Sequence, residues 1–268
     1  MMTQKQTFGP QGLVSFHVVD EHVGIITLER PEAMNAISGA LADDLTATAR
    51  EVARRPDVWV AVIAGAGEKA FCVGADLKER ANFELSDFYE NRKSIRTMFA
   101  SIRALPQPVV ASVFGFALGG GFELALSCDL VIAAEGTALG LPEARVGLLP
   151  AGGGTQLLTR KLGEARAKDM IFRGKRIDAQ VAADLGLVSQ VVPRDQLEDA
   201  TRELAADICR SSPVAVREAK RAIDQALGPL DEGIERENDS WKVVIETEDR
   251  VEGIKAFTEK RDPEWNNR

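Results

Sequence analysis

The sequence predicts an α/β fold, because short apolar strands alternate with helices through the first two thirds of the chain. Glycine-rich segments follow several of the apolar runs, as expected for tight crossovers between strands and helices. Hydrophobic residues make up 45% of the 268 residues and charged residues 28%, which is typical of a globular protein with a substantial core. From about Leu162 the predicted elements are mostly helices, and we place a boundary within residues 192–212.

The first half of the chain contains most of the predicted strands. Residues 13–19 and 23–28 are β-rich runs joined by a short polar segment, which predicts an antiparallel hairpin. Ser38 is expected to cap a helix that extends to about Arg54. Further strands are expected at 58–64, 108–113, 130–134 and 137–143, and a polar helix at 85–104 lies between the first two of these.

The second half is predicted to be helical. A glycine loop at 147–155 opens one helix, and 186–192 is expected to be the only strand among the helices that follow. The last helices carry more apolar surface than a short appendage can bury alone, so we expect them to pack against another subunit. The helices are expected at 164–172, 178–185, 194–210, 213–226, 230–247 and 249–259.

Composition and simple motifs argue against several classes of protein. A net charge of −8 disfavours general nucleic-acid binding, which needs a basic surface. Three widely spaced cysteines predict neither a disulfide framework nor a zinc site, and with only two histidines we expect no metal. The chain has no run of 18 apolar residues and its first 12 residues are polar, so we expect no membrane span, no signal peptide and a cytoplasmic location.

Two glycine segments are candidates for binding a negatively charged oxygen. Gly119–Gly121 lies where a strand gives way to a helix, so that backbone N–H groups can face a ligand. Gly74-Ala75-Asp76 follows the preceding predicted strand. One such segment alone is usually a tight turn, but two after successive strands favour a pair of amide donors that stabilise a carbonyl oxygen as it becomes an enolate.

Two glutamates are the best candidates for proton transfer. Glu123 lies three residues after Gly120 and so on the same face of the expected helix, and Glu143 follows an apolar run that ends in Pro142. A lone glutamate is usually a solvated surface residue, whereas two in apolar, glycine-flanked settings favour function. If they share one site, their pKa values are pushed apart, and the pair could then move the protons of a water molecule.

Four motifs in order along the chain carry a family resemblance. They resemble the motifs of the crotonase (enoyl-CoA hydratase/isomerase) superfamily, and the likeness extends from Leu28 to Arg261. The resemblance implies a spiral of ββα units over residues 1–200 and a C-terminal helical region over 201–268 that supports homotrimers or homohexamers. The segments are Phe71–Glu79 (FCVGADLKE), Gly119–Ala125 (GGGFELA) and Pro142-Glu143 followed by Pro150–Gln156 (PAGGGTQ).

The resemblance also implies roles for individual residues. Ala75 and Gly120 supply the oxyanion-hole N–H groups for the thioester carbonyl of an acyl-CoA. Glu123 and Glu143 match the two catalytic glutamates of the hydratases, which add water across a 2-enoyl-CoA double bond. Family members with other chemistry commonly lack one of this pair, so hydration is the preferred reaction.

Contacts with coenzyme A, which is part of the substrate and not a separate cofactor, are also implied by the resemblance. Ala151 departs from the glycine that many hydratases have at this position, and its methyl group is expected near the acyl site. One further pair of residues is similar to a C-terminal pair that reaches the CoA of a neighbouring subunit. The residues expected in the substrate's own subunit are Met34, Ala36, Ala75, Asp76, Leu77, Gly120 and Ala151, and the C-terminal pair is Phe257 and Lys260.

Two alternatives remain open at this stage. One is double-bond isomerisation of an enoyl-CoA with a single glutamate as the proton shuttle. The other is a non-catalytic RNA-binding module, for which the basic stretch 160–176 is the best support, although acidic residues interleave there and a solvated face is the simpler interpretation. Short linear, branched, hydroxylated and aromatic acyl groups are all compatible with the sequence.

Overall fold

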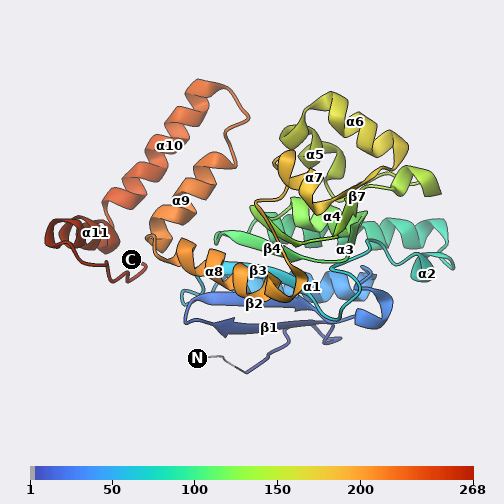
Figure 1. Ribbon diagram of the computed structural model, residues 1–268, viewed down its shortest axis with the longest axis horizontal. Coiled ribbons are helices and arrows are strands. Elements are labelled where there is room, and N and C mark those ends of the chain that lie inside the picture. Colours follow the sequence, from blue (N-terminus) through green and yellow to red (C-terminus); the bar gives the residue numbers. More distant parts are fainter. Residues whose placement is uncertain (1–3) are drawn as a thin grey trace.

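The computed structural model describes residues 4–268, and its framework is a six-stranded sheet flanked by helices (Figure 1). The first two strands form the predicted antiparallel hairpin, and every later neighbour pair in this sheet is parallel. The strands lie in the order β1-β2-β3-β4-β6-β9. Their bounds are β1 Val14–Val19, β2 Val23–Leu28, β3 Val60–Gly65, β4 Val109–Val113, β6 Leu130–Ala134 and β9 Gln190–Val192.

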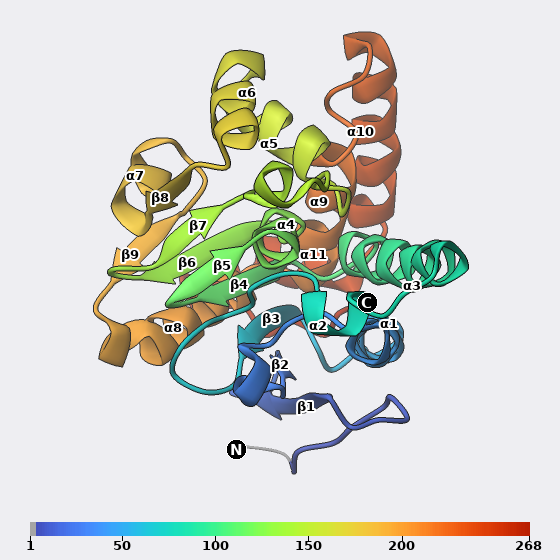
Figure 2. The same cartoon turned by 90° about the vertical axis from the view of Figure 1, so that its right-hand side faces the viewer.

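Helices cover both faces of this sheet (Figure 2). Helices α1 (Gly39–Ala53) and α3 (Leu85–Arg103) pack together over one face, where a large apolar cluster includes Leu45, Met98 and Phe122. Helix α8 (Leu197–Cys209) covers the other face and packs against β2, β3, β4 and β6. The Ser38 side chain accepts a hydrogen bond from the Leu41 N–H and caps α1, as predicted.

A second, smaller sheet lies beyond the ends of β4 and β6. It has three strands in the order β5-β7-β8, with β5 (Phe116–Leu118) parallel to β7 (Ala138–Gly140) and β7 antiparallel to β8 (Arg176–Asp178). Each of its first two strands follows a parallel strand of the main sheet directly, so this small sheet extends the carboxyl edge of the larger one. Helix α4 (Gly120–Leu126) packs against β5, and α7 (Ala179–Asp184) packs against β7 and β8. Three further helices are α2 Leu77–Arg80, α5 Gly154–Leu162 and α6 Glu164–Arg173.

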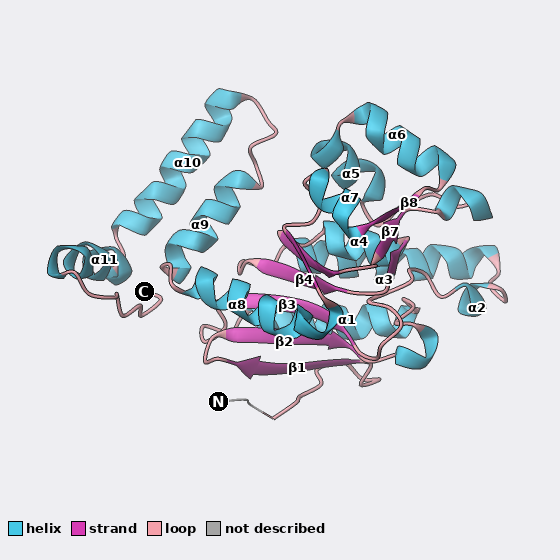
Figure 3. Cartoon of the chain, in the orientation of Figure 1, coloured by secondary structure: helices cyan, strands magenta, loops and turns pink. Residues whose placement is uncertain are grey.

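The C-terminal helices extend away from the sheets (Figures 1 and 3). These are α9 (Pro213–Ile223), α10 (Leu230–Ile245) and α11 (Glu248–Glu259), of which α9 and α10 pack against each other. Large apolar side chains on them are exposed to solvent, among them Leu230, Trp241 and Phe257. Within residues 4–268, no helix combines the length and the apolar composition that crossing a membrane would require.

Two features of the prediction need correction. The expectation that 186–192 is the only strand after Leu162 is wrong, because β8 also lies there, and the strand in 186–192 is limited to β9. β8 is three residues long and reads Arg-Ile-Asp, so its strand conformation comes from pairing with β7 and not from an apolar run. Strand β5 and helix α2 were not predicted either, since three and four residues are too few for a recognisable period.

Candidate active site

The small sheet brings the two predicted glutamate segments together. Leu118 at the end of β5 is in register with Gly140 at the end of β7, and the Gly119 N–H donates to the Gly140 carbonyl oxygen at 2.9 Å. Beyond these strands the chain leads on one side into α4, with Glu123 in its first turn, and on the other to Glu143. Residues that are 20 positions apart in the sequence therefore meet at one edge of the sheet.

The Ala75 segment joins the same edge through a separate backbone contact. Cys72 forms a parallel bridge with Ala117 of β5, and this bridge carries the following residues past the start of α4. A methyl group built on Gly120 would lie 3.7 Å from the Ala75 nitrogen, so the two amides are neighbours. Gly74 has φ +87°, and a side chain there would come within 2.8 Å of the Gly120 nitrogen, so glycine is required for this approach.

Both amides are free to donate to a ligand. Ile37 bonds to the carbonyl oxygen of Gly74 and to the N–H of Asp76, so the N–H of Ala75 points to the other side of the strand. Gly120 is the first residue of α4, where an N–H has no acceptor within the helix. Neither N–H donates to another group in residues 4–268, and both residues line the same cavity. The predicted pair of amide donors is thus present in one location.

Glu123 is held in a buried position by the glycine loop that precedes α5. Its side chain is 3% exposed, and its Oε1 accepts a hydrogen bond from the Gly154 N–H at 2.7 Å. Burial raises the pKa of Glu123 above its ordinary value, and hydrogen bonds from the backbone of residues 152–154 oppose that rise. A methyl group on Gly152 would lie 2.7 Å from Oε2 of Glu123, so the loop can approach the carboxylate only without a side chain.

Glu143 begins the short 3₁₀ helix Glu143–Val146 and faces the same cavity. Its Oε2 is buried and has no hydrogen-bond partner among the described residues. Burial raises the pKa of Glu143 to about 7, hydrogen bonding to its own backbone opposes the rise, and the charge of Glu123 adds to it. The two carboxyl groups therefore interact electrostatically, and Glu143 changes protonation state near neutral pH.

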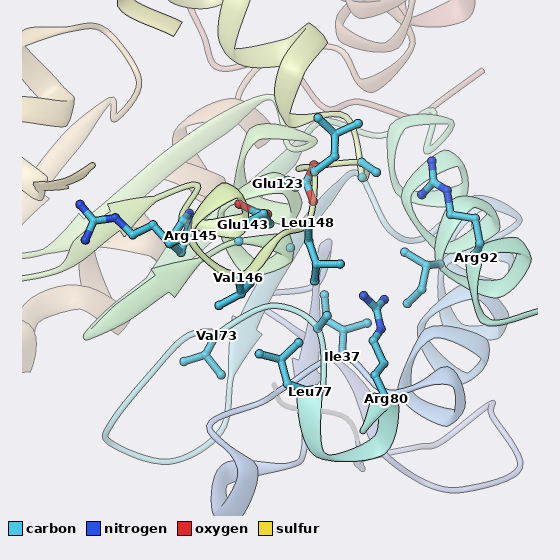
Figure 4. A pocket seen from close by; sticks show the side chains of 18 of the residues that line it. Ile37, Val73, Leu77, Arg80, Arg92, Glu123, Glu143, Arg145, Val146 and Leu148 are labelled. Carbon is cyan, nitrogen blue, oxygen red and sulfur yellow. The ribbon is translucent and has the colours of Figure 1, made fainter. Parts of the chain in front are cut away.

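The cavity that contains these groups has a volume of about 340 Å³ (Figure 4). Apolar side chains form much of its wall, and four arginines reach it in addition to the two glutamates. The apolar wall includes Ile37, Val73, Leu77, Ile95, Phe99, Val146, Leu148 and Leu149, and the arginines are Arg80, Arg92, Arg145 and Arg176.

Sequence reasoning missed the contribution of α3 to this wall. Arg92, Ile95 and Phe99 are spaced by three and four residues, so they lie on one face of the helix. The spacing was a usable signal, but such a stripe is more often part of a core than of a cavity. Only the packing of α3 beside α1 shows that this stripe meets the glutamates.

The remaining predicted substrate contacts divide into two groups. Leu77 and Ala151 line the cavity, whereas Met34, Ala36 and Asp76 do not. Asp76 caps α2 through its side chain and forms a salt bridge with Arg30, with Oδ2 and Nη2 3.0 Å apart. Arg30 also donates to the Ala36 carbonyl oxygen, so these residues form a supporting network next to the cavity.

Phe257 and Lys260 lie at the opposite end of the molecule from the cavity. Both are at the end of α11, and Phe257 is 87% exposed. Figure 1 places α11 far from α2 and α3, so within one chain these residues do not reach the glutamates. The expectation that they serve a neighbouring subunit stays a prediction.

The chemistry open to this site is acid–base and electrostatic. Two amide donors can stabilise a developing oxyanion, and two carboxyl groups with raised pKa values can exchange protons with a ligand beside it. Within residues 4–268 no three side chains of histidine, cysteine, aspartate or glutamate are grouped so that they could hold a metal ion.

Comparison with known proteins agrees with this arrangement. Residues 19–268 match the family model described as enoyl-CoA hydratase/isomerase. YngF of Bacillus subtilis, named for that family, is 43% identical over 249 residues, which is 92% of this chain and 96% of YngF. The 2,3-dehydroadipyl-CoA hydratase of Escherichia coli is 39% identical over 249 residues, with the same two coverages. A crystal structure of enoyl-CoA hydratase from Bacillus anthracis superposes with a TM-score of 0.93 at 42% identity, covering 96% of this chain and 100% of that one.

Proposed function

Because the chain belongs to the enoyl-CoA hydratase/isomerase family, we propose that it adds water to trans-2-enoyl-CoA thioesters to form 3-hydroxyacyl-CoA, or catalyses the reverse dehydration. The observation that carries this proposal is the meeting of Glu123 and Glu143 in one cavity beside the N–H groups of Ala75 and Gly120. Hydration needs both carboxyl groups, whereas moving a double bond needs one proton shuttle.

The geometry supports an oxyanion step at the thioester. The thioester carbonyl oxygen accepts hydrogen bonds from the Ala75 and Gly120 N–H groups, which draw electron density away from C3 and prepare it for attack. As the C–O bond to C3 forms, the electrons of the double bond move toward the carbonyl oxygen. The two amides stabilise the enolate because they point to where the negative charge develops.

The environments of the two glutamates suggest how they divide the proton transfers. Glu123 accepts hydrogen bonds from backbone N–H groups that favour its charged form, so it takes the proton from the attacking water. Glu143 has a pKa of about 7 and is partly protonated at neutral pH, so it donates the proton that C2 receives. Product release leaves Glu123 protonated and Glu143 charged, and proton exchange with solvent restores the starting state.

The proposal is tested with Glu123→Gln and Glu143→Gln, each of which keeps the size of the side chain and removes its acid–base function. We expect each variant to hydrate crotonyl-CoA about 10²–10⁴-fold more slowly, measured as loss of absorbance of the conjugated double bond. Glu90→Gln, on the exposed face of α3, is the matched control and should retain activity. Unchanged turnover in either catalytic variant would contradict the mechanism.

The same assays separate hydration from isomerisation. A 3-enoyl-CoA substrate reports isomerisation, because the double bond becomes conjugated and absorbance rises. If the protein isomerises this substrate but hydrates no 2-enoyl-CoA, the hydratase proposal is wrong and the isomerase alternative replaces it.

A further inference from the structure

None of the four arginines that line the cavity has a carboxylate partner among residues 4–268, and two of them, Arg80 and Arg92, lie on the same side of the glutamates (Figure 4). Arg80 of α2 and Arg92 of α3 both line it, and neither forms a salt bridge with any residue of the described range 4–268. A guanidinium that is partly removed from water without a counter-charge is costly, so proteins seldom keep one without a use. The chain has a net charge of −8, so acidic residues that could have paired with these arginines are in excess.

Arg80 is held in a fixed position. Its Nη2 donates to Oδ1 of Asn91 at 3.0 Å, and Asn91 is itself buried in the first half of α3. The Nε of Arg80 is buried and has no hydrogen-bond partner among the described residues. Burial lowers the pKa of Arg80, which reflects the same lack of solvation. The folded chain therefore orients this guanidinium but leaves one of its donors unsatisfied.

Arg92 lines the same cavity as the two glutamates. Its positive charge acts on Glu123, whose pKa it lowers, and it also acts on Arg80. One and two turns further along α3, Ile95 and Phe99 form an apolar part of the same wall. Figure 4 shows Arg80 and Arg92 on one side of the glutamates, and Arg145 on the opposite side.

We propose that the preferred substrate is an enoyl-CoA whose acyl chain ends in a second carboxylate, and that Arg80 and Arg92 bind this carboxylate. The inference rests on the proposed hydratase function and names its substrate class. Ile95 and Phe99 contact the hydrocarbon between the double bond and the carboxylate, and the two guanidiniums bind its charged end. Arginine suits this task because its planar fork of donors matches the two oxygens of a carboxylate.

The phosphates of CoA are the other anions that these arginines could meet. In the substrate, the pantetheine arm separates the phosphates from the thioester. Arg92 shares one face of α3 with Phe99, and the ring of Phe99 and Oε2 of Glu123 both lie against Gly152 at the reacting centre. An anion bound by Arg92 therefore lies on the acyl side of the thioester. A phosphate role would affect every CoA ester alike, and a carboxylate role would affect only acyl groups that carry the charge.

The test compares two substrates of equal chain length, trans-hex-2-enedioyl-CoA and trans-hex-2-enoyl-CoA, which differ by a terminal carboxylate. We expect the wild type to have the higher kcat/KM for the dioyl ester. Arg80→Met and Arg92→Met should each lower the ratio of kcat/KM for the dioyl over the monoacyl ester about tenfold to a hundredfold. The ratio is the informative quantity, because any effect of Arg92 on Glu123 acts on both substrates.

Two further variants complete the experiment. Arg96→Met removes an exposed positive charge one turn further along the same helix, outside the cavity, and should leave the ratio unchanged. Arg92→Lys keeps the charge and should retain part of the preference.

The outcomes test the carboxylate inference separately from the hydratase function. Hydration of the monoacyl ester with no preference for the dioyl ester overturns the carboxylate inference and leaves the hydratase function standing. An equal loss for both esters in the arginine variants, with weaker binding of free CoA, would assign the arginines to the phosphates and also overturn the inference. If neither ester is hydrated, the hydratase function itself fails.

Discussion

Replacing Glu143 by glutamine should change how the free energy of unfolding depends on pH. The pKa of Glu143 is raised in the folded protein from its ordinary value of 4.5 to about 7, mainly by burial. The folded state therefore keeps a proton that the unfolded chain releases between these two values. Its contribution to stability is fully present below pH 4.5 and is lost as the pH rises through about 7.

The size of this loss follows from the pKa shift. One pKa unit corresponds to about 1.4 kcal/mol, so the full shift would correspond to about 3 kcal/mol. Glu143 is only half-buried, and solvent screening reduces the expected effect to about 1–2 kcal/mol. The pH values 5 and 8.5 lie on either side of the folded pKa. Between them, the free energy of unfolding of the wild type should fall by about 1–2 kcal/mol more than that of Glu143→Gln, which has no proton to release.

Urea unfolding of both proteins at one protein concentration and several pH values measures the difference. Glu90→Gln, which changes an exposed glutamate, should follow the wild type. In Glu123→Gln the neighbouring charge is absent, so the pKa of Glu143 should fall and the loss of stability with pH should be smaller. Parallel pH profiles for the wild type and Glu143→Gln would refute the assignment of a raised pKa to Glu143.

Two other predictions concern the loop that holds Glu123 and the C-terminal helices. Gly152→Ala would place a methyl group 2.7 Å from Oε2 of Glu123 and 2.2 Å from the ring of Phe99. We expect thermal melts to show a loss of about 1–3 kcal/mol in the free energy of unfolding, and initial rates to show a hydratase kcat at least about tenfold lower. The exposed apolar side chains of α10 and α11, among them Trp241 and Phe257, should hold the protein in a trimer or hexamer, and a monomer in sedimentation at micromolar concentration would contradict this.

The elements with a clear period were predictable from the sequence, and the short ones were not. The hairpin β1–β2, the helix capped by Ser38 and the polar helix α3 were all expected close to their observed bounds. Strands β5 and β8 have three residues each, and they exist because β7 lies between them and pairs with both. Nothing local in Arg176–Asp178 distinguishes a strand from a helix start, so only the tertiary pairing decides its conformation.

The site was predictable where a motif joined residues that are close in the chain. Gly120 and Glu123 share one turn of α4, and their relation follows from helical spacing alone. Arg80 and Arg92 could not be found in this way, because ordinary solvated arginines have the same sequence signature. Their significance comes from their position, because they lie together on one side of Glu123 and Glu143 with no carboxylate partner among residues 4–268, and this is visible only in three dimensions.

The cavity keeps groups of opposite charge unsatisfied at the same time. Among residues 4–268, Oε2 of Glu143 is a buried acceptor without a partner and Nε of Arg80 is a buried donor without one, yet no salt bridge joins the two side chains. If stability alone had shaped the cavity, pairing such groups or replacing them by apolar residues would have removed both costs. Their separation leaves the carboxyl group free for proton transfer and the guanidinium free for an anion. A substrate with an uncharged reacting centre and a charged distal end would satisfy both.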